Sequence, residues 1–126
     1  DILTNYDFRG LYEYHLTSNA SMTVVAIDHT VQIPYGVIRE VDGYIKSIDE
    51  KPSHSFFCNA GIYSISSDVL HLLSNKSYFN MTDLVELCIY NSLLVSVFPL
   101  HEYWSDIGTP DQLMAARKFF MSNNKV

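Results

Sequence analysis

The sequence predicts an α/β domain in which helices flank a mixed sheet and a β-hairpin is inserted. Helical and strand patterns alternate along the chain, and a hairpin signal lies between them at residues 36–49. The chain has 126 residues, 48% hydrophobic and 17% charged, so a packed core is expected. A mostly antiparallel sheet would make the class α+β instead. No repeat, linker or charge block divides residues 1–126, which we expect to form a single domain or part of one.

The first part of the chain is expected to form a helix and then a strand. Apolar and aromatic side chains recur at helical spacing after Asp7, and the turn formers Ser18-Asn19 end the pattern. Residues 22–27 are dense in β-branched and apolar side chains, as in a buried strand. A loop is expected over residues 29–35, because it carries Pro34.

The clearest local signal is the hairpin over residues 36–49. Asp42-Gly43 is a preferred pair for a two-residue type I′ turn. Counting outward without a bulge gives these pairs: Val41 with Tyr44, Val37 with Ile48, Gly36 with Asp49, Tyr35 with Glu50, and Arg39 with Lys46 in an unfavourable like-charge pair. The open end therefore brings Tyr35-Gly36 beside Glu50-Lys51. Pro52 is expected to keep Lys51 extended.

The rest of the chain is expected to form strands over residues 56–65 and 93–99, with helices around them. Asn59-Ala60-Gly61 interrupts the first strand, which indicates a bulge, a close approach or plain packing. One helix is capped at Ser66-Ser67-Asp68, and a second is capped by Asn80 or Thr82. Thr109-Pro110-Asp111-Gln112 combines an N-cap, a first-turn proline and a glutamine three residues on, so a last helix starts there.

The composition argues against several classes of partner. Eight Lys and Arg against 14 Asp and Glu give a net charge of −6, without the basic run that nucleic-acid and membrane-surface binders carry. The longest apolar run, residues 93–100, is far shorter than the ~20 residues of a membrane span. Two cysteines without a Cys-x-x-Cys pair indicate reduced thiols and a cytoplasmic protein.

Three features could carry chemistry: Asp106 in a turn before a helix, Glu50-Lys51 before a proline, and the interruption at Asn59. Each also has a structural explanation. Asp106 could complement a helix dipole, and Glu50-Lys51 could be a solvated ion pair. The five scattered histidines argue against a zinc site, and no glycine-rich loop is present to bind a triphosphate.

Read in order, several strings resemble the sugar-1-phosphate nucleotidyltransferases. They are DILTNYDFRGLYEYH, YGVI, DGYIKSIDEKP, NAGIYSIS, MTDLVE and FPLHEYWSDIGTP. The resemblance covers almost the whole chain but only the C-terminal half of the family's Rossmann-like domain. A chain that opens on Asp1 rather than Met is consistent with a piece of a longer protein.

The resemblance implies a role for seven positions. Asp1 and Asp106 would hold Mg²⁺, Lys51 would contact the sugar phosphate and act with Asp106 in catalysis, Glu50 would bind sugar hydroxyls, the Gly36 backbone would touch the sugar, and Asn59 and Thr82 would add sugar contacts. The implied partners are a sugar 1-phosphate and a nucleoside triphosphate. The implied reaction gives a nucleotide sugar and pyrophosphate.

The sequence also departs from the family. The Gly-x-Gly-x-Arg loop that wraps the triphosphate and the lysine after it are missing, so we expect the chain alone to be inactive. A regulatory module that binds sugar phosphate is one alternative, although it would have little use for both Asp1 and Asp106. A glycosyltransferase is another, although the sequence has no Asp-x-Asp motif. A sheet edge exposed by truncation would invite self-association.

Overall fold

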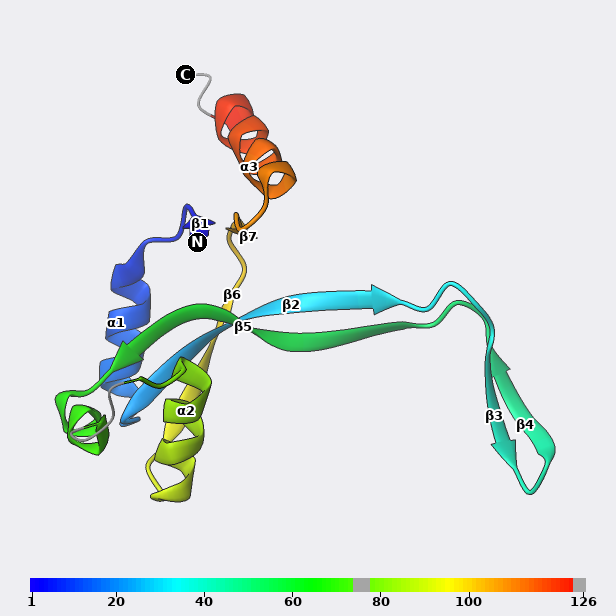
Figure 1. Cartoon of the computed structure of the whole chain (residues 1–126), viewed down its shortest axis with the longest axis horizontal. Coiled ribbons are helices and arrows are strands. Elements are labelled where there is room, and N and C mark those ends of the chain that lie inside the picture. Colours follow the sequence, from blue (N-terminus) through cyan, green and yellow to red (C-terminus); the bar gives the residue numbers. More distant parts are fainter. Residues whose placement is uncertain (74–77, 124–126) are drawn as a thin grey trace. The chain divides into compact units, whose positions relative to one another are not determined.

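The computed structural model describes residues 1–73 and 78–123 and divides the chain into two compact units (Figure 1). Unit 1 comprises Asp1–Ile27 and Asn59–Val126, and unit 2 comprises Asp28–Cys58. The elements in chain order are β1 (Ile2–Thr4), α1 (Phe8–Thr17), β2 (Met22–Gln32), β3 (Val37–Val41), β4 (Tyr44–Asp49), β5 (Ser53–Ile65), the 3₁₀ helix η1 (Ser67–Leu73), α2 (Met81–Tyr90), β6 (Val95–Leu100), β7 (Trp104–Asp106) and α3 (Pro110–Asn123).

The main sheet has the strand order β5-β2-β6. β2 and β6 are parallel, with Met22 opposite Val95 and Ile27 opposite Leu100. β5 runs antiparallel to β2, and the Ser66 N–H donates to the Ser21 carbonyl at 2.9 Å where β5 ends. The sheet is therefore mixed and helices accompany it, which confirms the predicted α/β class.

Helices pack on both faces of this sheet, because successive side chains of β2 point in opposite directions. Val25 faces α1, and Met22 faces η1 and α2. The buried residues form two clusters: Leu11, Val25, Ala60 and Leu100 on one face, and Met22, Val69, Leu84 and Cys88 on the other. Burying an aliphatic side chain of this size contributes about 1.5–3 kcal/mol, so these two clusters hold the helices to the sheet.

A buried polar network ties α1 to the sheet. His15 is only 6% exposed, and its Nδ1 lies 2.8 Å from Thr23 Oγ1 while its Nε2 lies 3.0 Å from Ser66 Oγ. Thr23 Oγ1 continues to Ser96 Oγ at 2.7 Å. Each ring nitrogen therefore has a hydroxyl partner, as burial of a polar group requires. Tyr12 shares the helical pattern with His15 but is exposed.

Side chains fix the helix ends where the sequence predicts them. Asp7 Oδ1 accepts from the Arg9 N–H at 3.1 Å at the start of α1. At the start of α2 the cap is Asn80 rather than Thr82, and its N–H donates to Asp83 Oδ2 at 3.0 Å. These bonds satisfy backbone groups that a helix end otherwise leaves unpaired.

The start of α3 confirms the predicted capping box. The Thr109 N–H donates to Gln112 Oε1 at 3.0 Å, and the Gln112 N–H donates to Thr109 Oγ1 at 3.3 Å. Ala116, on α3, is buried. Within the described residues, no helix is long and apolar enough to cross a membrane.

The hairpin of β3 and β4 forms as predicted, but its register shifts by one residue. Asp42 and Gly43 both have positive φ, +53° and +80°, as a type I′ turn requires. Val41 pairs with Tyr44 as expected. A bulge between Arg39 and Glu40 then leaves Lys46 without a direct partner, since Glu40 pairs with Ile45 and Arg39 with Ser47.

The bulge corrects three expectations. Val37 pairs with Asp49 rather than with Ile48, which pairs with Ile38 instead. Asp49 is therefore not the partner of Gly36. Arg39 faces Ser47, so the like-charge pair with Lys46 does not form. An inserted residue in one strand of a ladder has this effect, because every pair beyond it moves by one position.

Two other expectations about the chain path were wrong, and a third is refined in helix type. β2 continues to Gln32 where a loop was expected, because it keeps pairing with β5: the Ile33 N–H donates to the Pro52 carbonyl at 3.0 Å. Lys51 is not extended but has a φ of +47°. The helix expected after Ser66 is a 3₁₀ helix, η1.

Candidate functional site

At the open end of the hairpin, in unit 2, the Glu50 carboxylate lies against Gly36. A Cβ atom added to Gly36 would lie 3.0 Å from Glu50 Oε2 and 3.3 Å from Ile48 Cδ1. Any larger residue at position 36 would therefore displace the carboxylate. The predicted meeting of Gly36 and Glu50 is confirmed, and both residues are exposed to solvent.

Lys51 follows at a corner of the backbone. Its φ of +47° lies in the left-handed region, which a residue with a Cβ atom enters at a cost of roughly 1–2 kcal/mol. The next residue, Pro52, is held by the hydrogen bond from the Ile33 N–H to its carbonyl. Both sides of the corner are thus fixed, by the hairpin before it and by the β2–β5 pairing after it. The side chain of Lys51 is exposed.

In unit 1, the two predicted metal carboxylates belong to the short strands β1 and β7. These strands are antiparallel and pair Ile2 with Asp106. The Ile107 N–H donates to the Asp1 carbonyl at 2.9 Å and extends the pairing. Residues more than 100 positions apart are therefore neighbours, which local patterns in the sequence did not predict.

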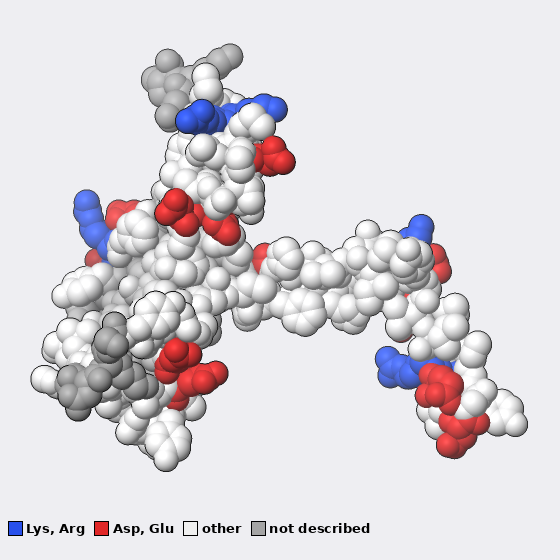
Figure 2. Space-filling model, in the orientation of Figure 1, with Lys and Arg blue, Asp and Glu red and all other residues white. Residues whose placement is uncertain are grey.

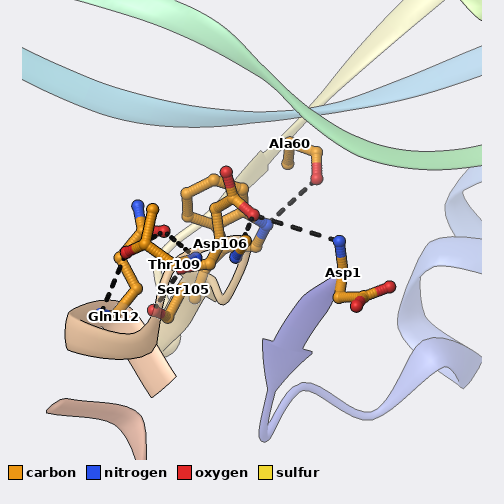
Figure 3. Close-up of polar contacts among 8 residues, drawn as sticks. Asp1, Ala60, Ser105, Asp106, Thr109 and Gln112 are labelled. Carbon is orange, nitrogen blue, oxygen red and sulfur yellow. Dashed lines mark hydrogen bonds and ion pairs between the residues drawn. The ribbon is translucent and has the colours of Figure 1, made fainter. Parts of the chain in front are cut away.

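Asp106 is held by the turn that follows it. Its Oδ1 accepts from the Gly108 N–H at 3.2 Å and lies 4.0 Å from the amino nitrogen of Asp1 (Figure 3). Figure 3 shows the main-chain nitrogen of Asp1 directed at Asp106, while the Asp1 carboxylate points away. The structure thus brings the two residues together but does not turn their carboxylates toward each other.

The two carboxylates remain open to ligands. The side chains of Asp1 and Asp106 are 92% and 54% exposed. In the described part of the chain, no three His, Cys, Asp or Glu side chains gather into a metal-binding group. Figure 2 shows acidic side chains over the region of β1, β7 and the start of α3. Exposed carboxylates of this kind are the oxygen ligands that a hard cation prefers.

Asn59 lies within β5, which runs through Asn59-Ala60-Gly61 without the interruption expected from the sequence, and its side chain is used within the strand. Its Oδ1 accepts from the Gly61 N–H at 2.9 Å, and its Nδ2 donates to Tyr63 Oη at 2.7 Å. Gly61 has a φ of +72°, and a Cβ there would lie 2.7 Å from Ile2 Cδ1. Of the explanations left open by the sequence, the structure shows a close approach of a side chain from β1.

Thr82 lies in the first turn of α2 and is exposed. No hydrogen bond or ion pair among the described residues joins it to Asp1, Asn59 or Asp106. Sequence reasoning gave no role to Trp104, whose indole Nε1–H donates to the Ala60 carbonyl at 3.0 Å. Its position two residues before Asp106 on a strand was the available signal, because such residues share a face.

The chain belongs to the nucleotidyl transferase family, whose model matches residues 1–123. Its relatives identify the branch as the sugar-1-phosphate nucleotidyltransferases, which confirms the resemblance read from the sequence. The chain spans about half or less of the length of the curated relatives it matches.

Three curated relatives illustrate the range of names. The chain is 28% identical over 127 positions to the mannose-1-phosphate guanyltransferase of Debaryomyces hansenii, covering 97% of the chain and 35% of that protein. It is 31% identical over 129 positions to the enzyme of the same name in Yarrowia lipolytica, covering 98% and 35%. It is 28% identical over 128 positions to the "probable glucose-1-phosphate cytidylyltransferase" of Bacillus subtilis, covering 100% and 49%.

Solved structures confirm the fold. A "putative glucose-1-phosphate thymidylyltransferase" from Bacillus anthracis matches with a TM-score of 0.65 and 22% identity, covering 94% of this chain and 51% of that one. HddC from Yersinia pseudotuberculosis, solved with GMP-PN, matches with a TM-score of 0.59 and 18% identity, covering 95% and 52%. The described chain therefore has the architecture of about half of these proteins.

Proposed function

We propose that the full-length protein transfers a nucleotidyl group from a nucleoside triphosphate to a sugar 1-phosphate and releases pyrophosphate. The observation that carries the proposal is the β1–β7 pairing, which places Asp1 beside Asp106 inside a chain that matches the family over residues 1–123. No observation favours a regulatory module or a glycosyltransferase instead. Because the triphosphate loop is missing from this sequence, we expect turnover only from the full-length protein.

The residues of this chain suit a reaction that needs positioning more than covalent chemistry. A phosphate oxygen of the sugar 1-phosphate attacks the α-phosphorus in line, and the bond from that phosphorus to pyrophosphate breaks. No general base is needed, because the attacking phosphate is already ionised at neutral pH. In this proposal Lys51 offsets the charge of the attacking phosphate, and Glu50 and the Gly36 backbone orient the sugar.

Asp1 and Asp106 would hold Mg²⁺. Their exposed carboxylates supply two hard oxygen donors and leave room for water and phosphate ligands. When bound, Mg²⁺ would neutralise charge on the phosphates. Asn59 and Thr82 would add sugar contacts. The cytoplasmic location expected from the cysteine usage stays part of this proposal.

The test is pyrophosphate release by the full-length protein, with several triphosphates crossed against several sugar 1-phosphates. GTP with mannose 1-phosphate comes first, because two of the relatives described above carry that name. Asp106→Asn should lower turnover on the order of 100-fold or more, since it removes a charged ligand from the Mg²⁺ that would stabilise the reacting phosphates. Asp111→Asn, which alters an exposed carboxylate in the first turn of α3, is the matched control.

Release that is specific for one pair and lost only in Asp106→Asn would support both the reaction and the role of Asp106. A folded protein that binds sugar phosphate but releases no pyrophosphate with any pair would overturn the transferase proposal. Equal losses in the two variants would overturn the specific role of Asp106, because a general effect of surface charge would then suffice.

A further inference from the structure

We propose that Trp104 is a positioning residue that sets the distance between the sugar-contacting strand β5 and the metal-binding carboxylate of Asp106. It acts through a single hydrogen bond, from its indole Nε1–H to the carbonyl of Ala60 at 3.0 Å. Trp104 is the only tryptophan in the chain. The inference rests on the proposed function, because it concerns the placement of the groups that would carry the reaction.

The geometry places Trp104 between two predicted site residues. On β7 it lies two residues before Asp106, on the same face of the strand. On β5 its acceptor, Ala60, is 1% exposed and directly follows Asn59. Figure 3 shows this bond reaching the Ala60 carbonyl from the region of Asp106. One side chain therefore links the strand of Asp106 to the residue after Asn59.

The bond is made next to Gly61, where the backbone of β5 leaves the usual strand conformation. Gly61 has a φ of +72°, and its N–H donates to Asn59 Oδ1 at 2.9 Å. The Ala60 carbonyl between them is buried, and a buried carbonyl without a partner costs about 1–3 kcal/mol. The indole supplies that partner from β7. If it were removed, the Asn59–Gly61 segment would move to find water or another donor.

The indole is also held firmly enough to transmit position. Its ring packs against the cluster of Leu11, Val25, Ala60 and Leu100. Its strand pairs with β1, where Thr4 is opposite Trp104. β1 also contacts β5 at Gly61, because Ile2 Cδ1 occupies the space where a Gly61 side chain would be. The three segments that carry Asp1, Asn59 and Asp106 thus meet around Trp104.

A displacement of this kind has a distinct kinetic signature. Misplacing a reacting group by about 1 Å can lower the rate on the order of 100-fold. Loss of the indole donor should therefore raise the KM for sugar 1-phosphate about tenfold and lower kcat, because Asn59 moves relative to Asp106. The KM for the triphosphate should stay within about twofold of wild type. A residue that only stabilises the fold would lower the melting temperature without this split between the two substrates.

The experiment replaces Trp104 in the full-length protein in two ways. Trp104→Phe removes the N–H but also shrinks the ring. The second replacement introduces 3-(3-benzothienyl)alanine at position 104, in which sulfur takes the place of the N–H and the two fused rings keep the shape of the indole. This second protein preserves the test if Trp104→Phe does not fold. Tyr103→Phe is the control, since the neighbouring ring stacks on Phe119 at 3.7 Å.

The inference is supported if the benzothienyl protein unfolds near the wild-type temperature, shows the raised sugar 1-phosphate KM, and differs from Tyr103→Phe. It is overturned if the benzothienyl protein has wild-type constants for both substrates. An inactive wild type would overturn the proposed function, and this inference with it. An active wild type with unchanged variants would overturn the inference alone.

Discussion

Replacing Lys51 with glycine should make the protein more stable and, at the same time, remove its activity. The backbone of Lys51 has a φ of +47°, which is unfavourable for every residue with a Cβ atom. Its ammonium group is the charge we assign to the attacking phosphate. Stability and function should therefore respond in opposite directions to the same substitution.

The magnitude follows from comparing Lys51→Gly with Lys51→Ala. Both variants lose the ammonium, so their difference isolates the backbone. A left-handed conformation costs an L-residue roughly 1–2 kcal/mol, and glycine avoids this cost. The greater freedom of glycine in the unfolded chain offsets about 0.5–1 kcal/mol of the gain. The free energy of unfolding of Lys51→Gly should therefore be higher than that of Lys51→Ala by about 0.5–1 kcal/mol. In a domain of 150–250 residues this difference corresponds to roughly 1–4 °C in melting temperature.

The assay pairs urea unfolding with pyrophosphate release, both on the full-length protein. Amide exchange of residues around the corner would detect the same difference if the hairpin opens locally. Turnover should fall on the order of 100-fold in both variants, because each removes one charged donor from the reacting phosphate. Equal stabilities of the two variants would refute the argument from backbone strain. Near wild-type turnover in both would refute the role of the ammonium.

Two further predictions concern Gly61 and the two cysteines. Gly61→Ala should lower the free energy of unfolding in urea by about 1–2 kcal/mol, because the φ of Gly61 is +72°. Adding Ile2→Val should recover little of this loss, since the Ile2 Cδ1 that a new Cβ would meet is the free end of a side chain. Full recovery would show that the clash with Ile2, and not the backbone conformation, causes the loss. Burial, with a smaller effect of Asp68, raises the pKa of the Cys88 thiol above its ordinary value of 9.0. The native state then keeps a proton that the unfolded chain has lost, so stability should fall as the pH rises above about 9. Cys88→Ala should flatten this dependence of stability on pH. Cys58, which is partly exposed, should react faster with a thiol reagent than Cys88. An unchanged pH dependence in Cys88→Ala, or a faster reaction at Cys88, would contradict the effect of burial.

Local signals in the sequence predicted the elements with their own turn or cap chemistry. Asp42-Gly43 specified the hairpin, and Thr109 with Gln112 specified the start of α3, because each pattern satisfies backbone groups within a few residues. Gly36 and Glu50 met for the same reason. The bulge at Lys46 was not predictable from the turn, since it depends on how the two strands twist around each other.

The features missed depend on distant partners. β1 and β7 have three residues each, too few for a pattern, and exist because they pair with each other. β2 extends to Gln32 because β5 offers it a partner. Lys51 adopts a left-handed backbone against the preference of a residue before proline. In each case tertiary pairing overrides a local tendency, and two of the three lie at candidate site residues.

The pairing of β1 with β7 also has a consequence for how the protein is made. It joins residues 2–4 to residues 104–106, so forming this pair closes a loop of about 100 residues and loses chain entropy. Local contacts do not offset this loss. Contacts of such long range slow folding and form late. During synthesis, Asp1 would wait without its partner until β7 has left the ribosome. The meeting of Asp1 and Asp106 would therefore be one of the last events of folding, and a chain stopped before residue 104 could keep its hairpin but never assemble the carboxylate pair.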